Sequence, residues 1–141
     1  MKIAIRYFTK SKKGNTKKLA DAVSEALQLK ALTIENPLEE QIDLLFFVNA
    51  MYAFNVDKEV RKYLKDNADK IKVLININSA ASGSSTLNSI KKATKDTSIE
   101  VSEKEFHCVG SWLALNKGRP NEDDLNKLKQ FVKEVRDSYL K

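Results

Sequence analysis

The residues of this chain whose types and spacing best suit a chemical task lie between positions 9 and 16, in the stretch TKSKKGNT. Four of them carry uncharged side chains that can donate a hydrogen bond: Thr9, Ser11, Asn15 and Thr16. Gly14 lets the backbone come close to a ligand or adopt a positive φ. Donors gathered in a short loop are suited to holding a phosphate group. An alternative is that Asn15 or Thr16 only caps the helix that follows.

The segments on either side of this loop favour the phosphate interpretation. An apolar run, IAIRYF, precedes it and predicts a strand, and KKLADAVSEALQL after it has the periodicity of a helix. A loop that leaves a strand and enters a helix presents backbone N–H groups and the positive end of the helix dipole. Lysines crowd the same stretch, at positions 10, 12, 13, 17 and 18. They would add positive charge beside a bound phosphate.

Strand and helix patterns alternate along the whole chain. Strands are expected over 3–8, 31–34, 43–48 and 71–77, with a last strand over 99–101 and 106–109 that is interrupted in between. Helices are expected over 16–29, 56–67, 86–95 and 121–139, and Asn121 is suited to cap the last one. The alternation predicts an α/β fold, a three-layer doubly wound five-stranded parallel sheet. Its 141 residues contain no linker or internal repeat and are expected to form a single domain, 1–141.

A doubly wound sheet binds its ligands beyond the carboxyl ends of the strands. Loops rich in small or polar residues leave three of these ends, at 9–16, 49–55 (NAMYAFN) and 78–85 (NSAASGSS). A fourth loop, 110–120 (GSWLALNKGRP), follows the last strand. We therefore expect the binding site where these loops meet.

Composition argues against several other functions. The net charge of +6 comes from 25 Lys and Arg against 19 Asp and Glu. The lysines are spread over most predicted helices, without a basic stripe interleaved with aromatic residues, so nucleic-acid binding is not expected. No apolar run approaches the roughly 20 residues that a membrane helix needs. Cys108 is the only cysteine, which excludes an internal disulfide and, without a signal-peptide pattern, favours a cytoplasmic protein.

The residues outside these loops do not indicate catalysis or a metal site. His107 is the only histidine, so a histidine-based metal site or catalytic triad is not expected. On a strand, His107 and Cys108 point to opposite faces and cannot act as a pair. Cys108 is interpreted as a small buried residue, and Asp123 and Asp124 as residues that start a helix.

Taken in order, these motifs resemble those of the flavodoxin-like family over essentially the whole chain. The phosphate loop of that family typically reads Ser/Thr-x-Ser/Thr-Gly-Asn-Thr, and Thr9, Ser11, Gly14, Asn15 and Thr16 match it. The strand and loop DLLFFVNAMYA are similar to the family's Asp-rooted apolar strand with a Tyr-containing loop. The stretch FHCVGSWLALNKGRPNEDDL resembles the end of small bacterial members.

The resemblance implies a sheet in the order 2-1-3-4-5 and a site for FMN. The phosphate of FMN would lie on Thr9, Ser11, Gly14, Asn15 and Thr16. The isoalloxazine ring would lie between two loops, with Asn49, Ala50, Met51 and Tyr52 on one side and Ser79, Ala80, Ala81, Ser82 and Gly83 on the other. Three aromatic residues are placed to touch a ring: Tyr52, Phe54 and Trp112.

The function implied is that of an FMN-binding redox protein, an electron carrier reduced by a separate reductase, with redox proteins, acidic ones among them, as partners. A small FMN-dependent oxidoreductase is the less favoured form of the same hypothesis. Two features differ from the family pattern: Lys12 and Lys13 stand between Ser11 and Gly14, and SAASGSS has no aromatic residue to stack on the ring. They leave a second hypothesis open, a flavodoxin-like module that has lost FMN and binds another anion or a protein partner.

Overall fold

The structure, a computed structural model, describes the whole chain except residues 11–13, 51–55, 112–115 and 141. Its elements in chain order are β1 (Ile3–Tyr7), α1 (Asn15–Leu27), β2 (Ala31–Thr33), β3 (Ile42–Ala50), α2 (Lys58–Asp66), the 3-10 helix η1 (Ala68–Lys70), β4 (Ile71–Ala80), α3 (Leu87–Thr94), β5 (Glu100–Val101), β6 (Phe106–Val109) and α4 (Glu122–Leu140).

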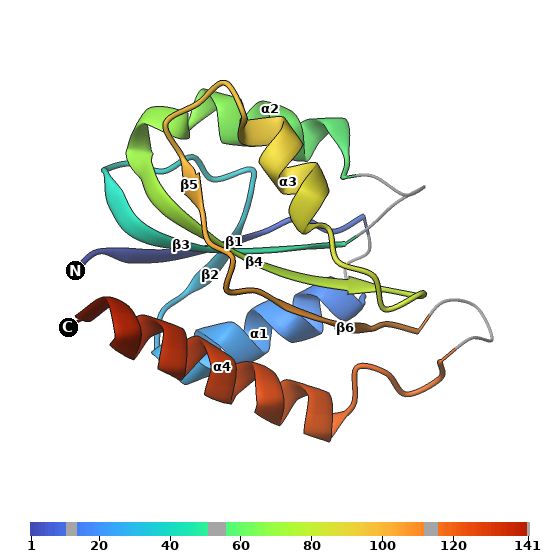
Figure 1. The fold of residues 1–141 in the computed structure, drawn as a ribbon. Coiled ribbons are helices and arrows are strands. Elements are labelled where there is room, and N and C mark those ends of the chain that lie inside the picture. Colours follow the sequence, from blue (N-terminus) through green and yellow to red (C-terminus); the bar gives the residue numbers. More distant parts are fainter. Residues whose placement is uncertain (11–13, 51–55, 112–115, 141) are drawn as a thin grey trace.

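The strands form one parallel sheet, which is the middle one of three layers. Its order is β2-β1-β3-β4-β5, and β6 also pairs with β4. Helices α1 and α4 cover one face of the sheet, and α2 and α3 cover the other (Figure 1). The expected doubly wound α/β fold with the order 2-1-3-4-5 is therefore confirmed. The interruption expected in the last strand divides it into β5 and β6, which pair with successive parts of β4.

Two cores, one on each side of the sheet, hold the layers together. Side chains on a strand alternate between faces, so Phe46 and Val48 of β3 pack toward α1 and α4, while Leu45 and Phe47 pack toward α2 and α3. All four are fully buried. The near-continuous apolar sequence of β3 is therefore the result of its central position, where both faces are covered.

The last helix, α4, begins with a reciprocal pair of hydrogen bonds. The N–H of Asp124 donates to Oδ1 of Asn121 over 3.0 Å, and the N–H of Asn121 donates to Oδ2 of Asp124 over 2.8 Å. This confirms the expected cap and is the arrangement of a capping box. Arg119 adds a two-pronged ion pair to the same carboxylate, with Nε–Oδ2 and Nη2–Oδ1 distances of 2.6 and 2.9 Å. Asp124 thus fastens the end of the 110–120 segment to α4.

Stability in acid should depend on Asp124. The hydrogen bonds from Arg119, and then the N–H of Asn121, hold the pKa of the Asp124 carboxyl below its usual range. Because the folded-state pKa is lowered, this stabilisation is present above the unfolded pKa of about 3.9 and is lost as the pH falls through the folded value. We expect Asp124→Asn to lower the free energy of unfolding at pH 7 by about 1–2 kcal/mol, with a flatter dependence on pH below about 4.

Urea unfolding between pH 3 and pH 7 measures both effects. Asp123→Asn is the matched control, because Asp123 is 72% exposed and forms an ion pair with Lys127 on the helix surface. Its removal should cost a few tenths of a kcal/mol, roughly the value of an exposed ion pair. Equal losses for the two variants would contradict the role given to Asp124.

Candidate functional site

The carboxyl ends of four strands meet at one edge of the sheet. Tyr7 of β1 is in register with Val48 of β3, Ala50 of β3 with Ser79 of β4, and Ala80 of β4 with Val109 of β6. The loops that follow these strands therefore start side by side (Figure 1). Of the residues predicted for the site, the following lie outside the described part of the chain: Ser11, Met51 and Tyr52, together with Lys12, Lys13, Phe54 and Trp112.

The first helix starts without a side-chain cap. Gly14 is the N-cap residue, in an extended conformation with φ −83° and ψ 179°, and no side chain of the described residues caps the helix. The alternative in which Asn15 or Thr16 is the cap is therefore not realised, since Asn15 is the first residue of α1 and the buried Thr16 is the second. The first turn contains no acidic residue. A helix start of this kind concentrates positive charge on its N–H groups and suits an anion.

Helices α2 and α4 start in the opposite way, whereas α3, like α1, has neither a hydrogen bond from its N-cap side chain nor an acidic residue in its first turn. At α2, the carboxylate of Asp57 accepts the N–H of Glu59 over 2.9 Å. At α4, Glu122, Asp123 and Asp124 fill the first turn. Acidic residues at these positions neutralise the helix dipole from within the protein. The start of α1 has no such negative charge among the described residues.

The carboxamide of Asn15 braces the predicted phosphate loop against a segment far away in the sequence. Its Nδ2 donates to the carbonyl of Ser111 over 2.8 Å, and the Ser111 hydroxyl donates to its Oδ1 over 3.2 Å. Gly110 makes this approach possible, because a Cβ there would lie 2.8 Å from Nδ2 of Asn15 and 3.3 Å from Cβ of Ser79. The sequence placed Gly110 and Ser111 in the fourth loop at the expected site, 110–120, but gave neither residue a role.

Two of the lysines near the predicted phosphate loop are engaged within the protein. Lys10 forms an ion pair of 3.0 Å with Asp57, whose side chain is 13% exposed, and so joins the loop after β1 to the start of α2. The pKa of the Asp57 carboxyl is lowered, chiefly by the N–H of Glu59 and further by Lys10. Lys17 forms an ion pair of 2.9 Å with Asp21 along α1. Part of the positive charge that the sequence places here is therefore neutralised.

Beneath the loops, three fully buried polar side chains join β3, β4 and the start of α3. Nδ2 of Asn49 donates to Oδ1 of Asn76 over 2.8 Å, and Nδ2 of Asn76 donates to the Thr86 hydroxyl over 3.0 Å. The Thr86 hydroxyl donates to Oδ1 of Asn49 over 2.7 Å, which closes the ring of hydrogen bonds. Asn49, predicted to border the flavin ring, thus uses its side chain inside the protein.

A fourth buried residue, Asn78, continues this network to the loop after β4. Its Oδ1 accepts the N–H of Thr86 over 3.1 Å, and its Nδ2 donates to the carbonyl of Ser84 over 2.9 Å. Among the described residues, no buried side-chain nitrogen or oxygen lacks a hydrogen-bond partner. The network therefore fixes where the loop after β4 leaves the sheet.

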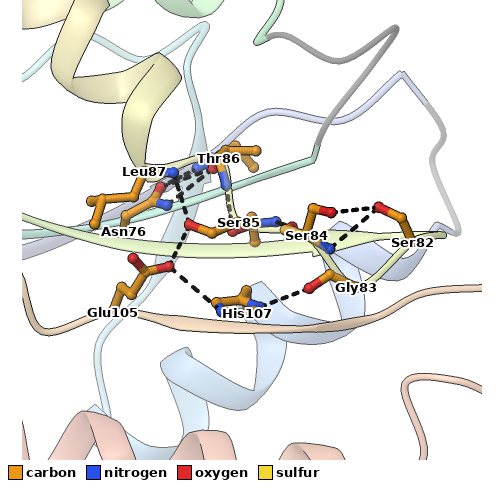
Figure 2. A network of polar contacts seen from close by, with 11 residues as sticks. Asn76, Ser82, Gly83, Ser84, Ser85, Thr86, Leu87, Glu105 and His107 are labelled. Carbon is orange, nitrogen blue, oxygen red and sulfur yellow. Dashed lines mark hydrogen bonds and ion pairs between the residues drawn. The ribbon is translucent and has the colours of Figure 1, made fainter.

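The loop after β4 is also hydrogen-bonded to β6 and to the residue just before it (Figure 2). Gly83 has φ +77°, a conformation that favours glycine. Its carbonyl accepts a hydrogen bond of 2.8 Å from Nδ1 of His107. The Ser85 hydroxyl donates to Oε1 of Glu105 over 2.5 Å and accepts the N–H of Leu87 over 2.9 Å. The predicted site residues Ala81, Ser82 and Gly83 therefore lie in a loop with a fixed shape.

His107 and Cys108 behave as the strand pattern predicts. His107 is exposed, and Cys108 is 8% exposed within the core that faces α1 and α4. Burial raises the pKa of the Cys108 thiol to about 11, so the thiol is protonated near neutral pH. No group of three or more His, Cys, Asp or Glu residues in the described ranges could hold a metal ion. No described helix is long and apolar enough to cross a membrane.

Comparison with known proteins places the fold. No protein-family model matches the sequence, and no curated protein matches it. A solved flavodoxin from the domain Archaea is similar over 98% of each chain, with 13% identity and a TM-score of 0.76. An NAD(P)H:quinone oxidoreductase from Methanothermobacter marburgensis is similar over 94% of each chain, with 12% identity and a TM-score of 0.62.

A flavoprotein from Lactobacillus acidophilus NCFM, solved in complex with FMN, is similar over 75% of this chain and 91% of its own. Its identity is 10% and its TM-score 0.57. At such identities the similarities define the fold. The chain has a flavodoxin-like fold.

Thr86 should be the most sensitive member of the buried network. Thr86→Val keeps the shape of the side chain but leaves Oδ1 of Asn49 and Nδ2 of Asn76 without their partner. We expect the free energy of unfolding to fall by about 2–3 kcal/mol. Thr94→Val is the matched control, because the equally buried Thr94 hydroxyl donates chiefly to the carbonyl of Ile90 in its own helix. Chemical denaturation measures both, and similar small losses would contradict a closed network around Thr86.

Proposed function

We propose that this chain binds FMN and works as an electron carrier, reduced by a separate reductase and delivering electrons to other redox proteins in the cytoplasm. The observation that carries the proposal is the start of α1, which has no side-chain cap and no acidic residue in its first turn. It lies at the edge of a flavodoxin-like sheet where ligands of doubly wound folds bind. FMN, when bound, supplies the one- and two-electron chemistry of its ring.

The residues at this edge fit a phosphate-bearing cofactor. Thr9, Ser11, Gly14, Asn15 and Thr16 would hold the phosphate, with the N–H groups of the first turn of α1 as donors. The Asn15 carboxamide is also hydrogen-bonded to Ser111, so its contribution to phosphate binding depends on the segment after β6. That brace keeps the helix start in place before any ligand arrives, which reduces the ordering cost of binding.

The ring would lie between the ends of β3 and β4 and the loops that follow them. The side chains of Asn49 and Asn78 are used within the network, so this part of the site offers a ligand chiefly backbone groups and small side chains. Such a slot suits a flat ring with polar atoms at its edge. The hydrogen bonds of Gly83 to His107 in β6, and of Ser85 to Glu105 just before β6, hold the loop after β4 in place.

An electron carrier fits these residues better than a stand-alone enzyme. The Cys108 thiol is buried and protonated, and Nδ1 of His107 is engaged by the carbonyl of Gly83. The quinone oxidoreductase with a similar fold keeps a small flavoenzyme as the alternative.

A second candidate, a module without FMN that binds another anion, is favoured by the engagement of Asn15 and Lys10. Their side chains bond to Ser111 and Asp57, and part of the donor set is therefore used within the protein. The helix start alone would serve a smaller anion such as phosphate. FMN titration separates the two candidates.

FMN should bind the apo protein with one-to-one stoichiometry. Titration of FMN with the purified chain, followed by quenching of flavin fluorescence, is expected to saturate at micromolar protein or below. Free phosphate should compete if the phosphate of FMN binds at the start of α1. No quenching, with phosphate binding retained in a calorimetric titration, would favour the second candidate.

The hydroxyl of Thr16 is the side-chain donor that can be tested most cleanly. Thr16→Val fills the same buried space without a hydroxyl, and Thr16→Ser keeps the hydroxyl. If this hydroxyl bonds the phosphate, we expect Thr16→Val to weaken FMN binding by about 1–3 kcal/mol and Thr16→Ser to retain most of the affinity. An unchanged dissociation constant for Thr16→Val would place the phosphate elsewhere.

The purified FMN-loaded protein should oxidise NADH and NADPH very slowly on its own. A carrier has no built binding site for the nicotinamide donor, whereas addition of a flavodoxin reductase should restore rapid reduction. Stopped-flow absorbance of the flavin measures both rates. Fast reduction without a reductase would identify a small flavoenzyme instead.

A further inference from the structure

A groove between α2 and α3 is lined by positive side chains. It lies on the face of the sheet opposite α1 and α4, and its volume is about 180 Å³. Four cationic residues line it: Arg61 and Lys65 from α2, and Lys92 and Lys95 from the end of α3. Asp96 is the single carboxylate among the lining residues. The groove therefore carries about half of the chain's net charge of +6.

These four cations differ from most others in the described part of the chain. Many lysines elsewhere are paired, for example Lys2 with Glu40, Lys62 with Asp66 and Lys129 with Glu25. Within the described ranges, none of the four groove cations forms an ion pair or donates a side-chain hydrogen bond. All four are exposed. Like charges that converge from two helices repel one another, and a negative partner would remove that repulsion.

We propose that this groove docks a carboxylate-rich segment of an acidic partner protein. Arg61 presents a planar fork that matches a carboxylate, and the three lysines surround it with point charges. None of the groove residues is aromatic, so the stacking platform that single-stranded nucleic acids use is missing. The proposal does not depend on FMN, because the groove consists of α2 and α3 side chains away from the start of α1.

The probe is a fluorescein-labelled oligoglutamate peptide, and its anisotropy is followed with the full-length chain at low ionic strength. We expect saturable binding that weakens as salt is added. The double variant Arg61→Gln/Lys92→Gln should weaken it by about three- to tenfold, since each exposed charge contributes modestly. Shifts of backbone amide resonances should gather on α2 and α3.

The matched control is the double variant Lys30→Gln/Lys133→Gln. It removes the same charge from exposed residues near the α1 and α4 layer and should change binding by less than about twofold. Equal weakening in both double variants would mean that only net charge matters, and would overturn the proposal. Absent peptide binding would overturn it as well. So would an oligothymidylate that bound the groove more tightly than the peptide and lost affinity in Arg61→Gln/Lys92→Gln.

Discussion

The arrangement of the sheet edge where the carboxyl ends of the strands meet depends on one constraint. The buried carboxamides of Asn49, Asn76 and Asn78 must all have hydrogen-bond partners. An unpaired amide in a dry interior is costly, and the sheet here is covered on both faces. The partners exist only when β3 and β4 stand in their observed register, with Asn49 opposite Asn78, and when Thr86 lies at the start of α3. A slip of one residue would replace these amides by apolar neighbours and leave others unpaired. The network thus specifies where the loops begin.

Helices α2 and α4 have acidic side chains near their starts, whereas the first turn of α1 has none. A helix gains about 0.3–1 kcal/mol from each acidic side chain near its start, and α1 does without that contribution. Lys17 and Lys18 stand in its early turns instead, although Asp21 compensates the first of them. Local rules are broken most often at functional positions, where a ligand supplies what the sequence omits. The missing negative charge, the extended Gly14 and the position at the sheet edge all agree with an anion as that ligand.

The sequence predicted the elements and their order far better than the contacts at the site. Strand and helix periodicity is local, so the layers, the divided last strand and the cap by Asn121 followed from it. The Asn15–Ser111 brace joins residues 96 positions apart, and no local pattern indicates it. Asn49 was predicted to border the flavin ring and Asn78 to begin the loop 78–85, while Asn76 lay within an expected strand and was given no role. Their network depends on the register between β3 and β4, which a single sequence does not encode in any short motif.

Ion pairs engage part of the positive charge on each side of the sheet. On the α1 and α4 side, Lys17, Lys127 and Lys129 each have a carboxylate partner, whereas Lys30 and Lys133 have none among the described residues. On the α2 and α3 side, Lys62 and Lys91 are paired, and the four groove cations have no partner within the described ranges, so unpaired positive charge gathers in the groove. Helices of eight or nine residues are only about 12–14 Å long, and α2 and α3 start at the carboxyl ends of β3 and β4. Lys65, Lys92 and Lys95 stand at the far ends of these helices, so a negative protein bound in the groove would lie about one helix length away from the edge where the loops meet.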